Sequence, residues 1–110
     1  MGSAMSENLA QAGFKVIGYD IDAGKTQALA ALGGVGADSP RQVAQQAEVV
    51  ITVLPSAAIL HEVLTAKNGL IAAGNQRLIV ADCGTFEIAD KQRCRTALAA
   101  AMIGMLDCTI

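Results

Sequence analysis

The stretch EVVITVLP, Glu48 to Pro55, decides the fold. β-Branched residues dominate positions 49–53, which favours an extended strand. Its apolar residues do not alternate with polar ones, as expected for a strand of a parallel sheet that is covered on both faces. Pro55 ends the run, because proline cannot donate to a strand ladder. The stretch therefore predicts a buried parallel strand.

The segments on either side of this strand alternate between helix and strand. Apolar spacing, glycines and capping residues predict helices near residues 5–12, 23–34, 39–47, 56–64 and 87–101. Short apolar runs predict strands at residues 15–20, 35–37 and 77–82, and one more from residue 105 onward. Such alternation with short connections is typical of a parallel α/β sheet, so the fold class is α/β.

The helices carry more detailed expectations about caps and buried faces. Ser39 can cap a helix that has Pro40 at its first position, with Gln42 completing a capping box. Helical spacing predicts a set of buried apolar side chains: Leu29, Leu32, Ile59, Leu60, Val63, Leu64, Cys94, Leu98 and Met102.

Composition and charge exclude several classes of protein. The chain has 110 residues, of which 53% are hydrophobic and 3% aromatic, with a net charge of −2. No cluster of basic residues alternates with aromatic ones, which argues against nucleic-acid binding, and no apolar run is long enough to span a bilayer. Three cysteines without C-x-x-C spacing indicate a reducing compartment and no zinc site. We therefore expect a cytoplasmic globular domain.

The first six residues, MGSAMS, permit three interpretations. They match the N-myristoylation signal on Gly2, they resemble the remnant of an expression tag, and Met1-Gly2 could end a phosphate-binding glycine loop. Asp20 follows Gly2 by 18 residues, with a helix and a strand between them, close to the spacing of a dinucleotide-binding unit. On that interpretation, which we favour, the first strand and two further glycines would lie upstream of Met1.

Several motifs together resemble one family. They are Met1-Gly2 with Met5, Asn8-Leu9, Ala12-Gly13, Tyr19-Asp20, Ser39-Pro40, AEVVITVLP at residues 47–55, NGLI at residues 68–71, Asp82 with Thr85, and Leu106-Asp107. The chain is thereby similar to the N-terminal domain of the β-hydroxyacid dehydrogenases. This family includes 3-hydroxyisobutyrate dehydrogenase and tartronate semialdehyde reductase and is related to 6-phosphogluconate dehydrogenase. The resemblance implies a Rossmann-type doubly wound sheet, residues 1–110 forming a partial NAD(P)-binding domain.

The resemblance also implies cofactor-binding residues. Met1 and Gly2 would lie at the helix N-terminus that receives the pyrophosphate, and Asp20 would bind the adenosine ribose. A carboxylate there favours NAD over NADP, while the nearby Lys25 keeps NADP open. The remaining contacts would come from Leu54, Pro55 and Ile59 after the decisive strand and from Thr85 near the nicotinamide. Leu54-Pro55 could equally be a simple strand terminator, and Thr85 could be a local helix cap.

The chain also departs from the family pattern. The family's D-x-S-T motif is DCGT here, with Gly84 in place of serine, which leaves the substrate class open. The family's catalytic lysine lies in a helical second domain that is absent from these residues, and neither Lys67 nor Lys91 occupies that motif. We therefore expect that this chain alone does not catalyse the oxidation or reduction of a hydroxy acid substrate. The chain could form a homo-oligomer.

Other residues have simpler interpretations. Lys91, Arg93 and Arg95 are predicted to form a solvated helix face, His61 to lie at the surface, and Cys83 and Cys108 to be small buried residues. An alternative function is a non-catalytic regulatory module on a flavodoxin-like sheet, such as a phospho-receiver. Such a module needs a hydroxyl residue directly after the strand at residues 49–53, but Leu54-Pro55 follows that strand here. It also needs a lysine directly after the strand at residues 77–82, but that strand ends in Asp82 and is followed by Cys83.

The missing first strand affects stability. In the strand order 3-2-1-4-5-6 it is the central one, so the strands at Val16 and Val49 would lack the partner between them. Each buried backbone group left unpaired costs about 1–3 kcal/mol. We therefore expect either a poorly stable chain or a sheet closed by direct pairing across the gap.

Overall fold

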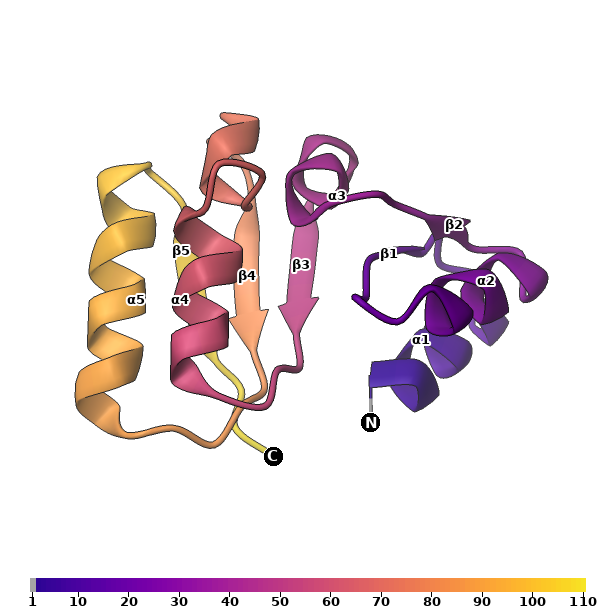
Figure 1. The fold of residues 1–110 in the computed structure, drawn as a ribbon, viewed down its shortest axis with the longest axis horizontal. Coiled ribbons are helices and arrows are strands. Elements are labelled where there is room, and N and C mark those ends of the chain that lie inside the picture. The colour runs from indigo at the N-terminus through magenta and orange to yellow at the C-terminus, as the bar shows by residue number, and fades with distance from the viewer. Residues whose placement is uncertain (1) are drawn as a thin grey trace.

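The computed structural model describes residues 2–110 and has the element order expected from the sequence. Its elements are α1 (Gly2–Gln11), β1 (Ile17–Gly18), α2 (Ala23–Ala31), β2 (Val35–Gly36), α3 (Pro40–Gln46), β3 (Val49–Thr52), α4 (Ala57–Thr65), the short 3-10 helix η1 (Ile71–Ala73), β4 (Ile79–Asp82), α5 (Ile88–Ala100) and β5 (Gly104–Asp107). The α/β fold is therefore confirmed (Figure 1). No helix within residues 2–110 is long and apolar enough to cross a membrane.

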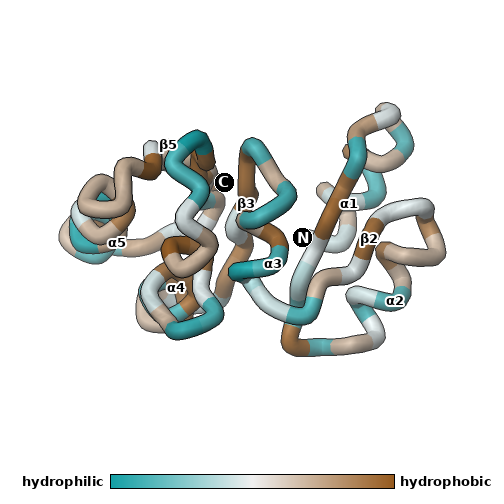
Figure 2. Tube along the Cα trace, turned by 90° about the horizontal axis from the view of Figure 1, so that it is seen from above, coloured by the Kyte–Doolittle hydropathy of each residue, from teal (hydrophilic) through white to brown (hydrophobic). Residues whose placement is uncertain are grey.

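The strands form two parallel sheets rather than one. β1 pairs with β2, and β3, β4 and β5 pair in that order. Figure 2 shows the two parts from above, with α1, α2 and β2 on one side and α4, α5 and β5 on the other. The place of a central strand thus stays open between β1 and β3. The alternative of direct pairing across this gap is wrong for the described residues, because β1 and β3 are not hydrogen-bonded neighbours.

The larger sheet is covered on one face. α4 and α5 lie against it (Figure 1), and Leu60, Leu64 and Leu98 from these helices join the core with Val50 and Val80. The opposite face carries exposed apolar side chains: Val49, Ile51, Ile79 and Leu106. The prediction that the decisive strand is covered on both faces is therefore wrong. β-Branched residues favour a strand, but they do not determine what packs on each of its faces.

Most helix signals are confirmed, and some differ in detail. Ser39 caps α3 by accepting a hydrogen bond from the Gln42 amide at 3.1 Å, with Pro40 at the start of the helix. The Gln42 side chain accepts from the Asp38 amide at 2.6 Å, so the reciprocal bond of the capping box reaches one residue further back than expected. Ser56 caps α4 in the same way, through the Ile59 amide at 3.2 Å.

Three positions that are predicted to be buried are instead 40–68% exposed: Leu32, Ile59 and Met102. α2 ends at Ala31, so Leu32 leaves the helical face that buries Leu29. α5 ends at Ala100, and Met102 adopts a left-handed conformation with φ of 63°. Ile103 then enters the core in place of Met102.

Candidate functional site

A cavity of about 1250 Å³ lies between the two sheets, and most of the predicted cofactor residues line it. Gly2 comes from the first turn of α1, Asp20 follows β1, and Leu54, Pro55 and Ile59 follow β3. The structure therefore brings together residues that are up to 57 positions apart in the sequence. Met1 lies outside the described residues.

The N-terminus of α1, at Gly2, lies beside the end of β3. A Cβ atom added at Gly2 would lie 3.9 Å from the Val53 Cβ, an ordinary contact. Within α1 the Ser6 hydroxyl donates to the Gly2 carbonyl oxygen at 2.9 Å. The first amides of a helix lack intrahelical acceptors and favour anions. The start of α1 is therefore suited to a phosphate group that enters the cavity here.

Asp20 lies between the large cavity and a second hollow of about 310 Å³. Its Oδ1 accepts a hydrogen bond from the Asp22 amide at 2.9 Å. Its Oδ2 lies 4.0 Å from the Lys25 ammonium, a distant and exposed pair. The carboxylate is thus held in place by a turn, and it keeps acceptor capacity for a ligand hydroxyl. The second hollow, beside Tyr19 and Thr26, offers room for a flat group next to it.

The cavity has an apolar wall where β3 ends, formed by Leu54, Pro55 and Ile59. The Ser56 cap starts α4 directly after Pro55, which keeps the connection from β3 short. Ile59 is 40% exposed, although it belongs to the apolar side of α4. These side chains give the cavity an apolar surface where β3 ends.

Thr85 is separate from these residues. It is exposed and does not line the cavity, and its hydroxyl donates to the Ile110 carbonyl oxygen at 3.3 Å. The idea that Thr85 caps α5 is wrong, because the N-cap is Glu87 and no side chain bonds the first amides there.

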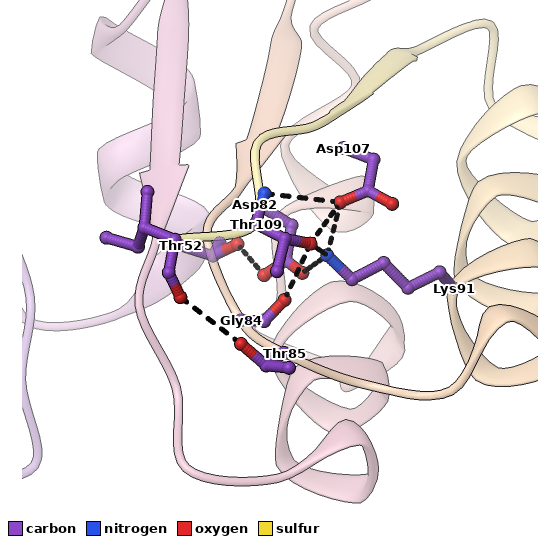
Figure 3. Close-up of polar contacts among 8 residues, drawn as sticks. Thr52, Asp82, Gly84, Thr85, Lys91, Asp107 and Thr109 are labelled. Carbon is purple, nitrogen blue, oxygen red and sulfur yellow. Dashed lines mark hydrogen bonds and ion pairs between the residues drawn. The ribbon is translucent and has the colours of Figure 1, made fainter.

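A buried charged cluster lies at the carboxyl ends of β3, β4 and β5, and sequence reasoning missed it (Figure 3). The Lys91 ammonium lies 2.6 Å from Asp107 Oδ1 and 3.1 Å from Asp82 Oδ2, and it donates to the Thr109 hydroxyl at 2.8 Å. The Thr52 hydroxyl donates to Asp82 Oδ1 at 2.7 Å. Asp82 is 0% exposed and Lys91 only 7%. The cluster joins α5 to the ends of three strands.

The prediction of a solvated face therefore fails for Lys91, whereas Arg93 and Arg95 are exposed. Two signals in the sequence could have revealed the cluster. Lys91 continues the buried spacing of Cys94 and Leu98 along one face of α5. Two neighbouring strands also end in an acid, and Asp82 and Asp107 share one register position.

The cluster shifts the pKa values of its members. Burial alone would lower the pKa of Lys91, but hydrogen bonds to Asp107 and Asp82 outweigh it and hold that pKa above its usual value. The hydrogen bond from Lys91, and next the one from Thr109, lowers the pKa of Asp107 to about 2.

These shifts predict how stability depends on pH. Because the pKa of Asp107 is depressed on folding, its contribution is present above the ordinary value of 3.8 and is lost as pH falls through about 2. The raised pKa of Lys91 acts in the opposite sense. Its contribution is complete below 10.5 and is lost as pH rises through the folded-state pKa.

We expect the free energy of unfolding to fall between about pH 4 and pH 2, measured by urea denaturation, and Asp107→Asn to flatten this slope. The exposed variant Glu62→Gln serves as the control. An unchanged slope in Asp107→Asn would contradict the assignment.

The Phe86 ring occupies the space that a side chain at position 84 would need, which explains why glycine stands there. Gly84 is buried, and a Cβ atom there would overlap Cε2 of the Phe86 ring. The same ring lies 5.8 Å from the Lys91 ammonium. A serine at position 84 would therefore have to displace Phe86, which covers the buried charge.

Of the two cysteines that are predicted to be buried, one is buried and the other is exposed. Cys83 is buried as predicted, and burial, followed by the nearby Cys108 and Asp82, raises the pKa of its thiol. Cys108 is exposed, so its predicted burial is wrong: β5 ends at Asp107, and the residues after it leave the covered face of the sheet. His61 is partly exposed on α4, next to Thr65.

Comparison with known proteins gives a consistent result. The model of the NAD binding domain of 6-phosphogluconate dehydrogenase matches residues 1–110. The 3-hydroxyisobutyrate dehydrogenase of Pseudomonas aeruginosa is 31% identical over 110 residues, which are 100% of this chain and 37% of that protein. The 3-sulfolactaldehyde reductase of Escherichia coli is 30% identical over 107 residues, 97% of this chain and 36% of that one. The chain thus spans little more than a third of the length of these relatives.

Solved structures agree with this assignment. The 3-hydroxyisobutyrate dehydrogenase of Mycobacterium tuberculosis superimposes with a TM-score of 0.84 at 26% identity, covering 96% of this chain and 35% of that one. An imine reductase from a Pseudomonas species reaches a TM-score of 0.87 at 18% identity, over 96% of this chain and 36% of that one, and shares the fold. The regulatory-module alternative is therefore not favoured. The chain belongs to the NAD-binding domain family of 6-phosphogluconate dehydrogenase, together with the matching region of the 3-hydroxyisobutyrate dehydrogenases.

Proposed function

We propose that this chain is the NAD-binding portion of an oxidoreductase that transfers hydride between the nicotinamide and a small 3-hydroxy acid. The observation that carries the proposal is the position of Asp20 between the two hollows, opposite the apolar wall that follows β3 and on the same cavity as the start of α1. These positions provide the contacts that a dinucleotide needs: an acceptor for the ribose, helix amides for the pyrophosphate and an apolar surface for a ring.

Asp20 accepts hydrogen bonds from the adenosine ribose hydroxyls. Its carboxylate repels a 2′-phosphate, and Lys25, at 4.0 Å in an exposed pair, compensates little of that repulsion. NAD is therefore preferred to NADP. The adenine lies in the second hollow, beside Tyr19 and Thr26.

Gly2 and the first amides of α1 face the pyrophosphate. Leu54, Pro55 and Ile59 support the nicotinamide half through apolar contact, and Thr85 lies further along the same edge of the strands. When bound, the nicotinamide supplies the hydride acceptor or donor. We assign no catalytic residue in this chain: Lys91 is held by two carboxylates, and Lys67 is exposed and outside the cavity. A second domain then supplies the proton-transferring group and the substrate site.

Titration of the protein with NADH and with NADPH, followed by calorimetry, tests the proposal. We expect tighter binding of NADH. Asp20→Ala should weaken NADH binding by about ten- to a hundredfold, the effect of losing hydrogen bonds to a charged group. The matched control is Glu62→Ala, an exposed acid on α4 outside the cavity.

The proposal is contradicted if NADH does not bind, or if Asp20→Ala and Glu62→Ala bind it equally well. A preference for NADPH would overturn the assignment of NAD alone.

A further inference from the structure

Two cysteines follow the ends of neighbouring strands in the large sheet. Cys83 comes directly after β4 and Cys108 directly after β5, and both are free thiols. We propose that Cys83 and Cys108 form a redox-active dithiol site, which a low-molecular-weight disulfide oxidises to an intramolecular disulfide. Neither cysteine lines the large cavity, so this site can be tested separately from the proposed function.

The strand register places the two cysteines opposite each other. β4 and β5 run parallel, and Asp82 pairs with Asp107 at their carboxyl ends. The ladder continues for one more residue, because the Cys108 amide donates to the Asp82 carbonyl oxygen at 2.8 Å. Cys83 and Cys108 therefore occupy the next paired position. Neighbouring strands lie about 4.7–4.9 Å apart, within the span of about 4.4–6.8 Å between Cα atoms that a disulfide bridges.

Side-chain hydrogen bonds hold the two segments together beyond the cysteines. The Thr109 hydroxyl donates to the Gly84 carbonyl oxygen at 3.3 Å (Figure 3). The Thr85 hydroxyl donates to the Ile110 carbonyl oxygen, also at 3.3 Å. The segments that follow β4 and β5 thus run next to each other, and the two cysteines are held at neighbouring backbone positions.

Both thiols belong to the same face of the large sheet. Side chains alternate between the two faces along a strand. Asp82 and Asp107 contact Lys91 of α5, so their side chains lie on the face that the helices cover. Cys83 and Cys108 are the next residues and therefore point to the other face. The two sulfur atoms share one side of the sheet, as a disulfide requires.

The surroundings of the two thiols assign them different roles. Cys108 is exposed, whereas Cys83 is only 7% exposed. Burial, followed by the proximity of Cys108 and of Asp82, raises the pKa of the Cys83 thiol. Because the thiolate is the attacking species and must reach the oxidant, Cys108 reacts first with a disulfide from solvent. Cys83 then reacts with its neighbour.

The oxidation consists of two thiol–disulfide exchanges. The Cys108 thiolate attacks one sulfur of oxidised glutathione, which forms a mixed disulfide and expels one glutathione thiolate. The Cys83 thiol loses its proton, and its sulfur attacks Cys108 Sγ, which forms the protein disulfide and expels the second glutathione thiolate. The two protein sulfurs lose two electrons, which the oxidised glutathione gains. The two protons from the cysteines go to the two glutathione thiolates.

Peptide mapping tests the proposal, because trypsin separates the three cysteines of the chain. Cleavage after lysine and arginine places each cysteine in a peptide of its own: residues 78–91, 94–95 and 96–110. The reduced protein is incubated with oxidised glutathione, remaining thiols are blocked with N-ethylmaleimide, and the digest is analysed by mass spectrometry. We expect peptides 78–91 and 96–110 to be joined, lighter than their sum by two hydrogen atoms, and to separate on reduction.

Cys94 provides an internal control. It lies between the other two in the sequence, 11 positions from Cys83 and 14 from Cys108, and it is 1% exposed on α5. Shorter loops close more readily in an unfolded chain, so oxidation in urea should favour the bonds that include Cys94. In the folded protein, the bond between Cys83 and Cys108 should exceed them by about tenfold or more, because the register holds this pair together.

Three variants test the order of the two exchanges. Cys83→Ser should stop at the mixed disulfide, with one glutathione on Cys108. Cys108→Ser should leave the buried Cys83 unmodified in the folded protein. Cys94→Ser should give the joined peptides in the same yield as the unchanged protein.

The proposal would be overturned by glutathione on Cys108 of the unchanged protein without a bond to Cys83. Bonds to Cys94 in equal yield in the folded protein would also overturn it. A bond between two copies of peptide 96–110 in place of the expected product would do the same, because Cys108 would then pair between molecules.

Discussion

Replacing Lys91 with methionine is expected to lower the free energy of unfolding by about 3–5 kcal/mol, the usual cost of removing one partner of a buried ion pair. The ammonium is the counter-charge of Asp82, which is 0% exposed, and it also bonds Asp107 and Thr109. Methionine fills similar space without a charge. Because domains of this size are stable by about 5–15 kcal/mol, this loss would be a large share of the total stability.

Urea denaturation followed by circular dichroism measures this change, and α5 itself offers a matched control. Arg93 is 66% exposed and pairs with Asp90 on the surface, so Arg93→Met should cost less than about 1 kcal/mol. Adding Asp82→Asn to Lys91→Met should recover part of the loss, because no unpaired charge then remains buried. Equal effects of Lys91→Met and Arg93→Met would mean that the cluster does not stabilise the fold.

Gly69→Ala is expected to have the second-largest effect, about 1–3 kcal/mol of destabilisation. A Cβ atom at Gly69 would lie 2.6 Å from the Val63 carbonyl oxygen and 2.9 Å from that of Leu64. Both are backbone atoms of α4, so the substitution must move the end of the helix rather than a side chain. The movement would also strain the bond of 2.9 Å that the Leu70 amide donates to Val63.

Gly104→Ala is the control for Gly69→Ala. A Cβ atom at Gly104 meets nothing within 4 Å, so its effect should stay within about 0.5 kcal/mol. Thermal unfolding of the two variants side by side measures the difference. A Gly69→Ala protein as stable as Gly104→Ala would show that the end of α4 yields easily.

Much of the fold could be predicted because its signals are local. Ser39, Pro40 and Ser56 mark where helices begin, and the apolar runs mark the strands in their correct order. The uncovered face of the large sheet could not be predicted, since the residues of β3 do not encode what packs against Ile51. The spacing of Gly2 and Asp20, together with the strand order of a dinucleotide-binding fold, predicts the open gap, and the structure shows that β1 and β3 do not close it.

The candidate site was predictable in part for a similar reason. Asp20 and Pro55 follow strands, and parallel strands bring such residues to one edge of a sheet. The residue type of Lys91 alone predicts a solvent-exposed side chain. Its burial depends on Asp82 and Asp107, which lie 9 and 16 positions away. That pairing became visible only once the strand register was known.

The unequal distribution of the core between the two halves has a consequence for ligand affinity. All members of the main hydrophobic cluster lie between Ala37 and Met105, and Leu29 is the one buried hydrophobic residue in the segment 2–36. Segments with few buried contacts open more often than the rest of a protein. Asp20 belongs to this segment, so the apparent dissociation constant for a dinucleotide equals the intrinsic one divided by the fraction of molecules in which the segment is in place. Affinity could then rise without any new contact to the ligand, simply through a larger population of the ordered N-terminal half.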